Sequence, residues 1–325
     1  MSERFYKVYG LHVCSALKLP ELEEVEETIA DVNIRVGSVP SSLPNAARRT
    51  REIDVGKKTY LLRVPGVARY LVEGGRRITL QPLSDETLAP KVADVRLFLL
   101  GSAFGALVHQ RGLLPLHIAA ILTADGITGF TGPSGAGKST LAGWFLQRRG
   151  VDLFSDDVSV LCPNDDRLML HPGPRRLKLW HDALDLLGFD RSQARQDLSN
   201  TPKYQVWPEH SKAPPAAPLV RMVELARGEK QATPSLERLR GSEAFDVVMR
   251  SIYRPATGGW FQDSGKLVRS IASICSSIEV QRFSRSWSLE RLSSDLEFLE
   301  TQLRASGSAS TTEPNYFGTV GVRGD

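Results

Sequence analysis

The chain has 325 residues, a formal net charge of +4, and hydrophobic and charged fractions of 41% and 24%. These values are typical of a globular protein, and the length suits two domains. Basic residues are scattered or in short pairs rather than in a run or a stripe, so no nucleic-acid partner is expected. The three cysteines, Cys14, Cys162 and Cys275, lie far apart with no C-x-x-C pair. This spacing excludes a disulfide framework and a zinc site and favours a reducing compartment.

The sequence shows no sign of a secretory signal or of a membrane-spanning segment. The N-terminus has no apolar run of the kind that forms a secretory signal, which favours a cytoplasmic protein. The longest apolar run, residues 97–108, is shorter than the roughly 20 residues that span a membrane. We therefore expect a buried helix there and no membrane partner. The sequence leaves homo-oligomerisation open.

Residues 1–88 predict a small β-rich domain. Short runs of β-branched and aromatic residues at 5–9, 32–36 and 58–62 predict strands. Residues 68–73 and 76–80 flank Gly74 and Gly75, a pair typical of a β-hairpin turn. No side chain in this part has an evident catalytic role.

Residues 89–303 predict an α/β domain. A helix is expected at 92–110, closed by Gly112, followed by strands at 113–122 and 127–131 and a helix after them. A further strand at 152–161 passes through Asp156 and Asp157, and the polar, proline-rich residues 189–217 predict a long loop. Later elements are strands at 219–225 and 278–280 and helices at 242–253, 265–276 and 289–303. The composition of residues 304–325 predicts a disordered tail.

The most specific motif is Gly-Pro-Ser-Gly-Ala-Gly-Lys-Ser-Thr at residues 132–140, which matches the phosphate-binding G-x-x-x-x-G-K-[ST] pattern in full. A predicted strand precedes it and a predicted helix follows, so backbone N–H groups and a helix N-terminus converge on one point. Lys138 is expected to reach the outer phosphates of a nucleotide, and the Ser139 hydroxyl to ligate Mg²⁺. The residues expected to bind the nucleotide are Gly132, Ser134, Gly135, Ala136, Gly137, Lys138, Ser139 and Thr140.

Asp156 and Asp157 follow Lys138 by 18 and 19 residues. A helix from Lys138 to residue 148 and a returning strand at 151–155 are each roughly 16 Å long, so the pair comes back level with the phosphate-binding loop. A carboxylate at that edge can hold Mg²⁺ or accept the proton of an attacking hydroxyl. The plainer interpretation is a turn, which is the one we favour for the second pair, Asp165 and Asp166.

Three further features carry less specific signals. One face of a predicted strand carries Arg176, Lys178 and Trp180. The cations on this face are expected either to contact a phosphate or an acidic peptide, or to be exposed to solvent without a ligand. His117 lies on the predicted strand before the loop, at a position compatible with the same edge. Lys203 and Arg250 are weaker cationic candidates.

Together these residues resemble the catalytic domain of HPr kinase/phosphorylase. The shared pieces are a histidine on a strand ahead of the loop, the G-x-S-G-x-G-K-S motif, a short helix ending in Arg-Gly, and Asp-Asp on the next strand. The resemblance implies an α/β P-loop kinase domain of the HPr-kinase type, with Asp156 as the base and His117 near the transferred phosphate. Asp157 then supports the metal. Thr140 replaces the glutamate common in the family, and residues 1–90 do not resemble its usual N-terminal domain.

The opening Tyr-Lys-Val-Tyr-Gly-Leu and the Pro-Gly-Pro-Arg-Arg-Leu-Lys-Leu-Trp segment are similar to a divergent branch of that family. Members of this branch phosphorylate a serine on ribosomally made peptides, notably lasso-peptide precursors. The resemblance implies an ATP- and Mg²⁺-dependent kinase acting on a serine of a peptide or small protein, with Arg176 and Lys178 as substrate or phosphate contacts. Two alternatives stay open: a kinase of free serine, and a non-catalytic nucleotide-binding regulator.

Overall fold

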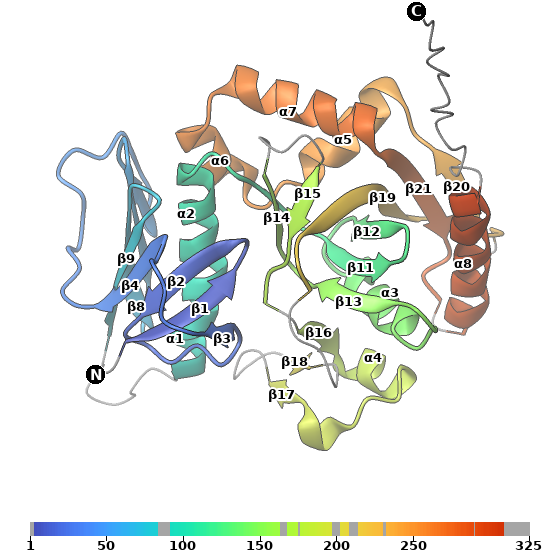
Figure 1. Cartoon of the computed structure of the whole chain (residues 1–325), viewed down its shortest axis with the longest axis horizontal. Coiled ribbons are helices and arrows are strands. Elements are labelled where there is room, and N and C mark those ends of the chain that lie inside the picture. Colours follow the sequence, from blue (N-terminus) through green and yellow to red (C-terminus); the bar gives the residue numbers. More distant parts are fainter. Residues whose placement is uncertain are drawn as a thin grey trace, which may run out of the picture.

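A computed structural model describes residues 3–83, 92–162, 168–174, 176–196, 202–207, 214–229, 232–288 and 290–308. For residues 306–308 it describes the backbone helix only. The chain is mixed α/β and contains several sheets (Figure 1). Among the described residues, two sheets have nine strands each and one has three. The second predicted aspartate pair, Asp165 and Asp166, lies outside the described residues.

The N-terminal sheet is built from residues 4–82, as their strand-forming composition predicts. Its spatial order is β3-β1-β2-β4-β9-β8-β7-β6-β5. The predicted hairpin is confirmed: β8 and β9 pair antiparallel, and Gly74 and Gly75 take φ values of 56° and 66°, which favour glycine. The strands are β1 (Arg4–Val8), β2 (Leu11–Ser15), β3 (Glu23–Val25), β4 (Val32–Val36), β5 (Arg48–Arg49), β6 (Ile53–Val55), β7 (Thr59–Val64), β8 (Ala68–Glu73) and β9 (Arg77–Pro82).

The predicted apolar helix forms as α1 (Val92–Phe98), a π-helical turn (Leu99–Ala103) and α2 (Phe104–Gln110). By length and composition this stretch could cross a membrane, with a mean hydropathy of 1.4, but 61% of it is buried inside the protein. Its buried side chains share one core with the N-terminal sheet, including Tyr6, Tyr70 and Phe104. The helix therefore packs with residues that lie before the predicted boundary at 88/89, and that boundary stays a prediction.

The second nine-stranded sheet carries the phosphate-binding motif. Its main path is β10-β14-β15-β19-β12-β11-β13, and β21 extends it beside β19 and β20. Strands β12, β19 and β21 run parallel, while β11 pairs antiparallel with both β12 and β13. The strands are β10 (Leu114–Leu116), β11 (Ala119–Thr123), β12 (Gly126–Thr131), β13 (Asp152–Ser155), β14 (Ser159–Leu161), β15 (Met169–His171), β19 (Ala217–Arg227), β20 (Ser235–Arg238) and β21 (Glu279–Arg285).

Helices cover both faces of this sheet. Because successive strand residues point to opposite sides, one strand contacts both layers of helices. On one face Phe130 packs with α3 (Lys138–Phe145), α4 (His181–Leu186) and α8 (Leu292–Ser308). On the other face Ile127 packs with α5 (Gly241–Ser251) and α7 (Ser264–Ser277), and the short α6 (Pro255–Phe261) lies against α2. These layers fix the ends of β12 and β13, and with them the position of the motif.

Several predicted elements differ in detail. The strand expected at 113–122 is interrupted at His117, and the one expected at 152–161 is interrupted at Asp156 and Asp157. The loop expected at 189–217 contains a 3₁₀ turn (Arg191–Gln193) and two strands, β17 (Arg195–Gln196) and β18 (Lys203–Val206). Strand β18 is the middle strand of the three-stranded sheet and pairs with β17 on one side and with β16 (Leu177–Trp180) on the other. Helix α8 continues to Ser308, past the predicted start of the tail at 304, and residues 309–325 lie outside the described residues.

Candidate active site

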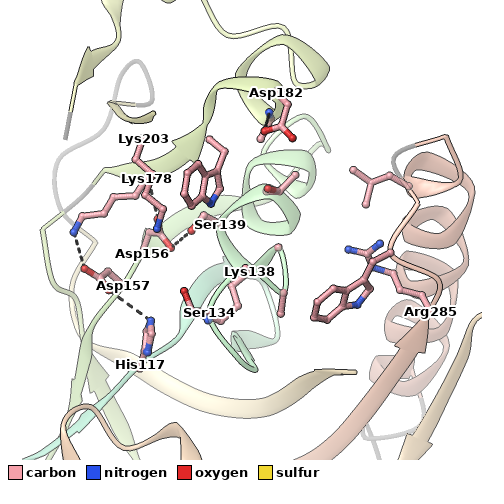
Figure 2. A pocket seen from close by; sticks show the side chains of 18 of the residues that line it. His117, Ser134, Lys138, Ser139, Asp156, Asp157, Lys178, Asp182, Lys203 and Arg285 are labelled. Atoms are coloured by element: carbon pink, nitrogen blue, oxygen red, sulfur yellow. Dashed lines mark hydrogen bonds and ion pairs between the residues drawn. The ribbon is translucent and has the colours of Figure 1, made fainter. Parts of the chain in front are cut away.

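A cavity of about 330 Å³ opens where β12 and β13 end and α3 begins. Strand β13 runs antiparallel to β11, and β11 runs antiparallel to β12, so β12 and β13 end at the same edge of the sheet. The predicted return of the aspartate pair to the motif is thus reproduced, with β11 between the two strands. Figure 2 shows side chains that line this cavity, which we call the nucleotide cavity after the phosphate-binding motif in its wall. They include His117, Ser134, Lys138, Ser139, Asp156, Asp157, Lys178, Asp182, Lys203 and Arg285.

The phosphate-binding loop keeps glycine where other side chains would not fit. Gly132 has a φ of 140°, and a Cβ there would lie 2.9 Å from the carbonyl oxygen of Leu225. Gly137 precedes α3 in the left-handed region, with a φ of 89°. The backbone can therefore turn sharply into the helix and leave its first N–H groups free to face the cavity, as anion binding requires.

Lys138 lies folded over its own loop. Its Nζ donates hydrogen bonds to the carbonyl oxygens of Gly132 at 2.9 Å and Pro133 at 3.1 Å. Burial lowers the pKa of Lys138, although the two nearby aspartates oppose that shift. Both carbonyl contacts are neutral acceptors, so an anionic phosphate in the cavity would be a stronger partner for this ammonium group.

Asp156 lies against the first turn of α3. Its Oδ1 accepts a hydrogen bond from the Ser139 hydroxyl at 2.9 Å, and its Oδ2 accepts one from the backbone N–H of Lys178 at 2.8 Å. The residue is 4% exposed. Burial raises the pKa of Asp156 to about 6, against the opposing effect of the Lys178 N–H. Both of its oxygens are therefore committed within the protein.

Asp157 faces away from Ser139. Its Oδ2 accepts a hydrogen bond from Lys178 Nζ at 2.8 Å, and its Oδ1 lies 3.6 Å from Nε2 of His117 (Figure 2). Burial alone would raise the pKa of Asp157, but the charge and the hydrogen bond of Lys178 outweigh it and hold the pKa at about 2. The backbone takes a φ of 84° here, uncommon for a residue with a Cβ. That turn sends two consecutive carboxylates to different partners.

His117 is held from both sides. Its backbone N–H donates to the carbonyl of Ser251 at 2.6 Å, and its ring packs edge-on against Tyr253. Burial, followed by the charge of Lys138, lowers the pKa of His117 despite Asp157. The imidazole is therefore neutral at pH 7 and can donate one hydrogen bond into the cavity.

The two aspartates have contacts that differ from those expected for the roles that the sequence implied. Asp156, expected to be the base, contacts the expected metal ligand Ser139. Asp157, expected to support the metal, contacts Lys178 instead, and its side chain is 35% exposed. The difference arises because the strand ends at Ser155, so a turn rather than a regular strand sets the direction of each side chain.

Some of the other predicted residues line the nucleotide cavity and others do not. Lys178 and Trp180 line the nucleotide cavity, and so does Lys203, whose Nζ lies 5.2 Å from the centre of the Trp180 ring. Arg176 precedes β16 and does not line this cavity. Arg250 pairs with Glu224 at 2.9 Å and does not line it either.

Sequence reasoning missed three residues. Arg285, at the end of β21, is 6% exposed, and its Nε has no hydrogen-bond partner among the described residues. Its Nη2 would lie 3.3 Å from a Cβ at Gly137, so the guanidinium group lies next to the phosphate-binding loop and lines the same cavity. Trp287 and Asp182 also line the cavity. None of them belongs to a motif, because β21 and α4 reach this edge only through the tertiary packing.

These residues fit ATP and Mg²⁺. The glycine cradle, Lys138 and the unpaired Nε of Arg285 suit the phosphates, and Trp180 and Trp287 offer aromatic surface for a base. Ser139 and Asp156 together form an oxygen-rich pair of the kind that holds Mg²⁺ with a nucleotide. Among the described residues, no group of three or more His, Cys, Asp or Glu side chains could hold a metal by itself.

No family model matches the chain, and no curated protein matches it in sequence. Among solved structures, the chain is similar to the Hpr(Ser) kinase/phosphatase from Coxiella burnetii. The identity is 13%, the match covers 60% of this chain and 95% of that chain, and the TM-score is 0.28. A likeness at this level carries no argument about the site, so the proposed function rests on the residues that line it.

Proposed function

We propose that this protein is an ATP- and Mg²⁺-dependent kinase that transfers a phosphoryl group to a serine hydroxyl. The observation that carries the proposal is the junction at Asp156 and Asp157. One carboxylate is bonded to the Ser139 hydroxyl of the phosphate-binding loop, and its neighbour in the chain faces the open side of the cavity. A site for phosphates and a site for proton removal thus lie side by side.

On the nucleotide side, backbone N–H groups of residues 135–140 bind the phosphates. Lys138 and Arg285 place positive charge beside the oxygens of the transferring group, which carry negative charge in a loose transition state. Ser139 and Asp156 would hold Mg²⁺, which neutralises phosphate charge when bound. Asp156 suits this role because it is fixed and buried, with its carboxylate against Ser139.

On the acceptor side, Asp157 accepts the proton of the serine hydroxyl. The hydroxyl oxygen bonds to the γ-phosphorus, the bond from that phosphorus to the bridging oxygen breaks, and ADP leaves. With a pKa of about 2, Asp157 is a weak base. A loose transition state demands little basicity, because the hydroxyl proton is lost late. The neutral His117 ring, next to Asp157, can donate to the transferred phosphate.

The acceptor we favour is a serine of a peptide or small protein, as in kinases of lasso-peptide precursors. Free serine is the alternative acceptor, and binding of ATP without transfer is the regulator alternative. A long cleft would favour a peptide, whereas a closed cavity would favour a metabolite. Labelled ATP offered with free serine and with serine-containing peptides separates these candidates.

The matched pair Asp157→Asn and Asp156→Asn tests the assignment of roles. Asp157→Asn should lower the transfer rate by about 10²–10⁴-fold with little change in the affinity for ATP, since only the proton acceptor is lost. Asp156→Asn should chiefly raise the Mg²⁺ concentration needed for half-maximal rate. Initial rates over a Mg²⁺ titration measure both. A wild-type rate for Asp157→Asn, with the loss confined to Asp156→Asn, would restore the original assignment.

A further inference from the structure

A second cavity, of about 210 Å³, lies on the other side of the aspartate pair. It shares Asp156, Asp157 and Lys178 with the nucleotide cavity, but no residue of the phosphate-binding loop lines it. Its walls come from the N-terminal sheet, the apolar helix, the turn before β16 and the segment after α5. The residues that matter here are Tyr9, Ser102, Arg176 and Arg254. We call this space the acceptor cavity.

Arg176 is the central observation. It lines the acceptor cavity and is 5% exposed. Within the part of the chain that the structure describes, no hydrogen bond or ion pair reaches its guanidinium group, and its one hydrogen bond is made by the backbone N–H to Pro174. The charge of Arg176 is felt by Asp157, whose pKa it helps to lower, but no described residue takes up its guanidinium N–H groups, so these donors are available to an anion in the cavity.

The neighbouring groups point the same way. Arg254 donates to the Ser102 hydroxyl at 2.8 Å and lies over the Tyr253 ring, which leaves further N–H groups for a ligand. The Tyr9 hydroxyl makes no hydrogen bond to any described residue, and burial, followed by the charge of Asp157, raises the pKa of Tyr9, so it stays a donor.

The negative groups that face the acceptor cavity are already occupied. Asp157 is paired with Lys178, and both oxygens of Asp156 accept hydrogen bonds. Arg176 and Arg254 therefore leave an excess of positive charge in a small, largely buried space.

We propose that the acceptor cavity binds an anionic group of the acceptor molecule, a carboxylate or a phosphate, through Arg176, Arg254 and Tyr9. This inference rests on the proposed function and deepens it, because Asp157 lines both cavities and would meet the acceptor hydroxyl between them. It implies an acceptor whose hydroxyl lies a few bonds from a negative charge. It also gives the N-terminal sheet a part in substrate selection, through Tyr9.

The experiment compares acceptors that differ only in charge. N-acetyl-L-serine is paired with its neutral amide, and glycerol 3-phosphate with glycerol, each with labelled ATP. The first pair tests a carboxylate and the second a phosphate. We expect kcat/KM to be at least about tenfold higher for the charged member of one pair, as one charge-assisted hydrogen bond supplies.

The variants assign that preference to residues. Arg176→Met should reduce the ratio of charged to neutral acceptor to about one while leaving the KM for ATP unchanged, and Arg176→Lys should keep part of it. Arg111→Met is the matched control, since Arg111 is a part-buried arginine paired with Asp31 and Gly75 outside both cavities. Thermal melts with and without MgATP show that each variant is folded. Equal use of charged and neutral acceptors by the wild type overturns the proposal, and so does a preference that survives in both Arg176→Met and Arg254→Met.

If none of the four compounds is phosphorylated, calorimetric titration of the charged compounds decides. They are titrated into the protein loaded with Mg²⁺ and a non-hydrolysable ATP analogue. Binding to the wild type that Arg176→Met abolishes supports the acceptor cavity even if kinase activity fails. No binding, or equal binding by the variant, overturns it. The proposed kinase activity is judged separately, by transfer from labelled ATP.

Discussion

The two cavities that meet at Asp157 are built in different ways. The nucleotide cavity takes its phosphate-binding wall from one contiguous segment, residues 132–140, and its carboxylates from the next strand. The acceptor cavity gathers residues from five separate parts of the chain, and Tyr9, Ser102, Arg176 and Arg254 come from four of them. The phosphates of a nucleotide are bound by backbone N–H groups, which need a fixed local geometry. An acceptor is recognised by side chains that the fold brings together from distant parts of the chain. The difference explains why a sequence motif predicts the nucleotide cavity and no motif predicts the acceptor cavity.

Lys138→Ala should produce the largest effect, and it should impair phosphoryl transfer without impairing binding of the acceptor. Loss of the main cation on the transferring group is expected to lower the transfer rate by about 10²–10³-fold or more. Binding of a charged acceptor compound to the acceptor cavity should be unchanged. Quench-flow transfer from labelled ATP, with calorimetry of the acceptor, measures both. A parallel loss of acceptor binding would show that the two cavities do not act separately.

Asp156→Asn should change stability with pH, which sharpens the contrast between the two carboxylates. Folding raises the pKa of Asp156 from 3.8 to about 6, so the native state holds this proton more tightly than the unfolded state. The stability that this proton supplies is present at low pH and is lost as the pH rises through 6. The variant is therefore expected to be more stable than wild type at pH 8 by up to on the order of 3 kcal/mol.

The difference should vanish below about pH 4, where the carboxyl is protonated in both states. Urea unfolding over a pH series gives the free energies. Asp157→Asn serves as the control, because the pKa of Asp157 is held low by Lys178 and this variant should lose stability at neutral pH. If Asp156→Asn is the less stable protein at pH 8, burial does not penalise that carboxylate.

Arg285→Met should have the smallest effect and is the counterpart of Arg176→Met on the nucleotide side. The loss of one charge-assisted hydrogen bond to phosphate is expected to raise the KM for ATP roughly tenfold, about 1.5 kcal/mol. The ratio of charged to neutral acceptor should stay at its wild-type value. Steady-state kinetics with both substrates varied separate the two parameters. An unchanged KM for ATP would show that Arg285 supports the loop without contacting the phosphates.

Much of the nucleotide side could be predicted from the sequence. The motif needs glycine at fixed positions because the backbone turns through a positive φ and passes close to β19, as at Gly132. The return of Asp156 to the loop followed from the matched lengths of one helix and one strand. The two broken strands were not foreseen, because composition does not show where a strand yields to a turn, and it was the turn at Asp157 that gave the two carboxylates their different partners.

The amino-acid sequence by itself determined the phosphate-binding loop, the strand content of the N-terminal sheet and the buried helix, since each depends on residues close together in the chain. Only the tertiary structure decided which aspartate contacts Ser139, that Arg285 lies next to the loop, and that Tyr9, Arg176 and Arg254 line one cavity. The physical reason is that such approaches are set by how sheets and helices pack over long separations. Packing of that kind leaves no periodic or local trace in the order of the residues.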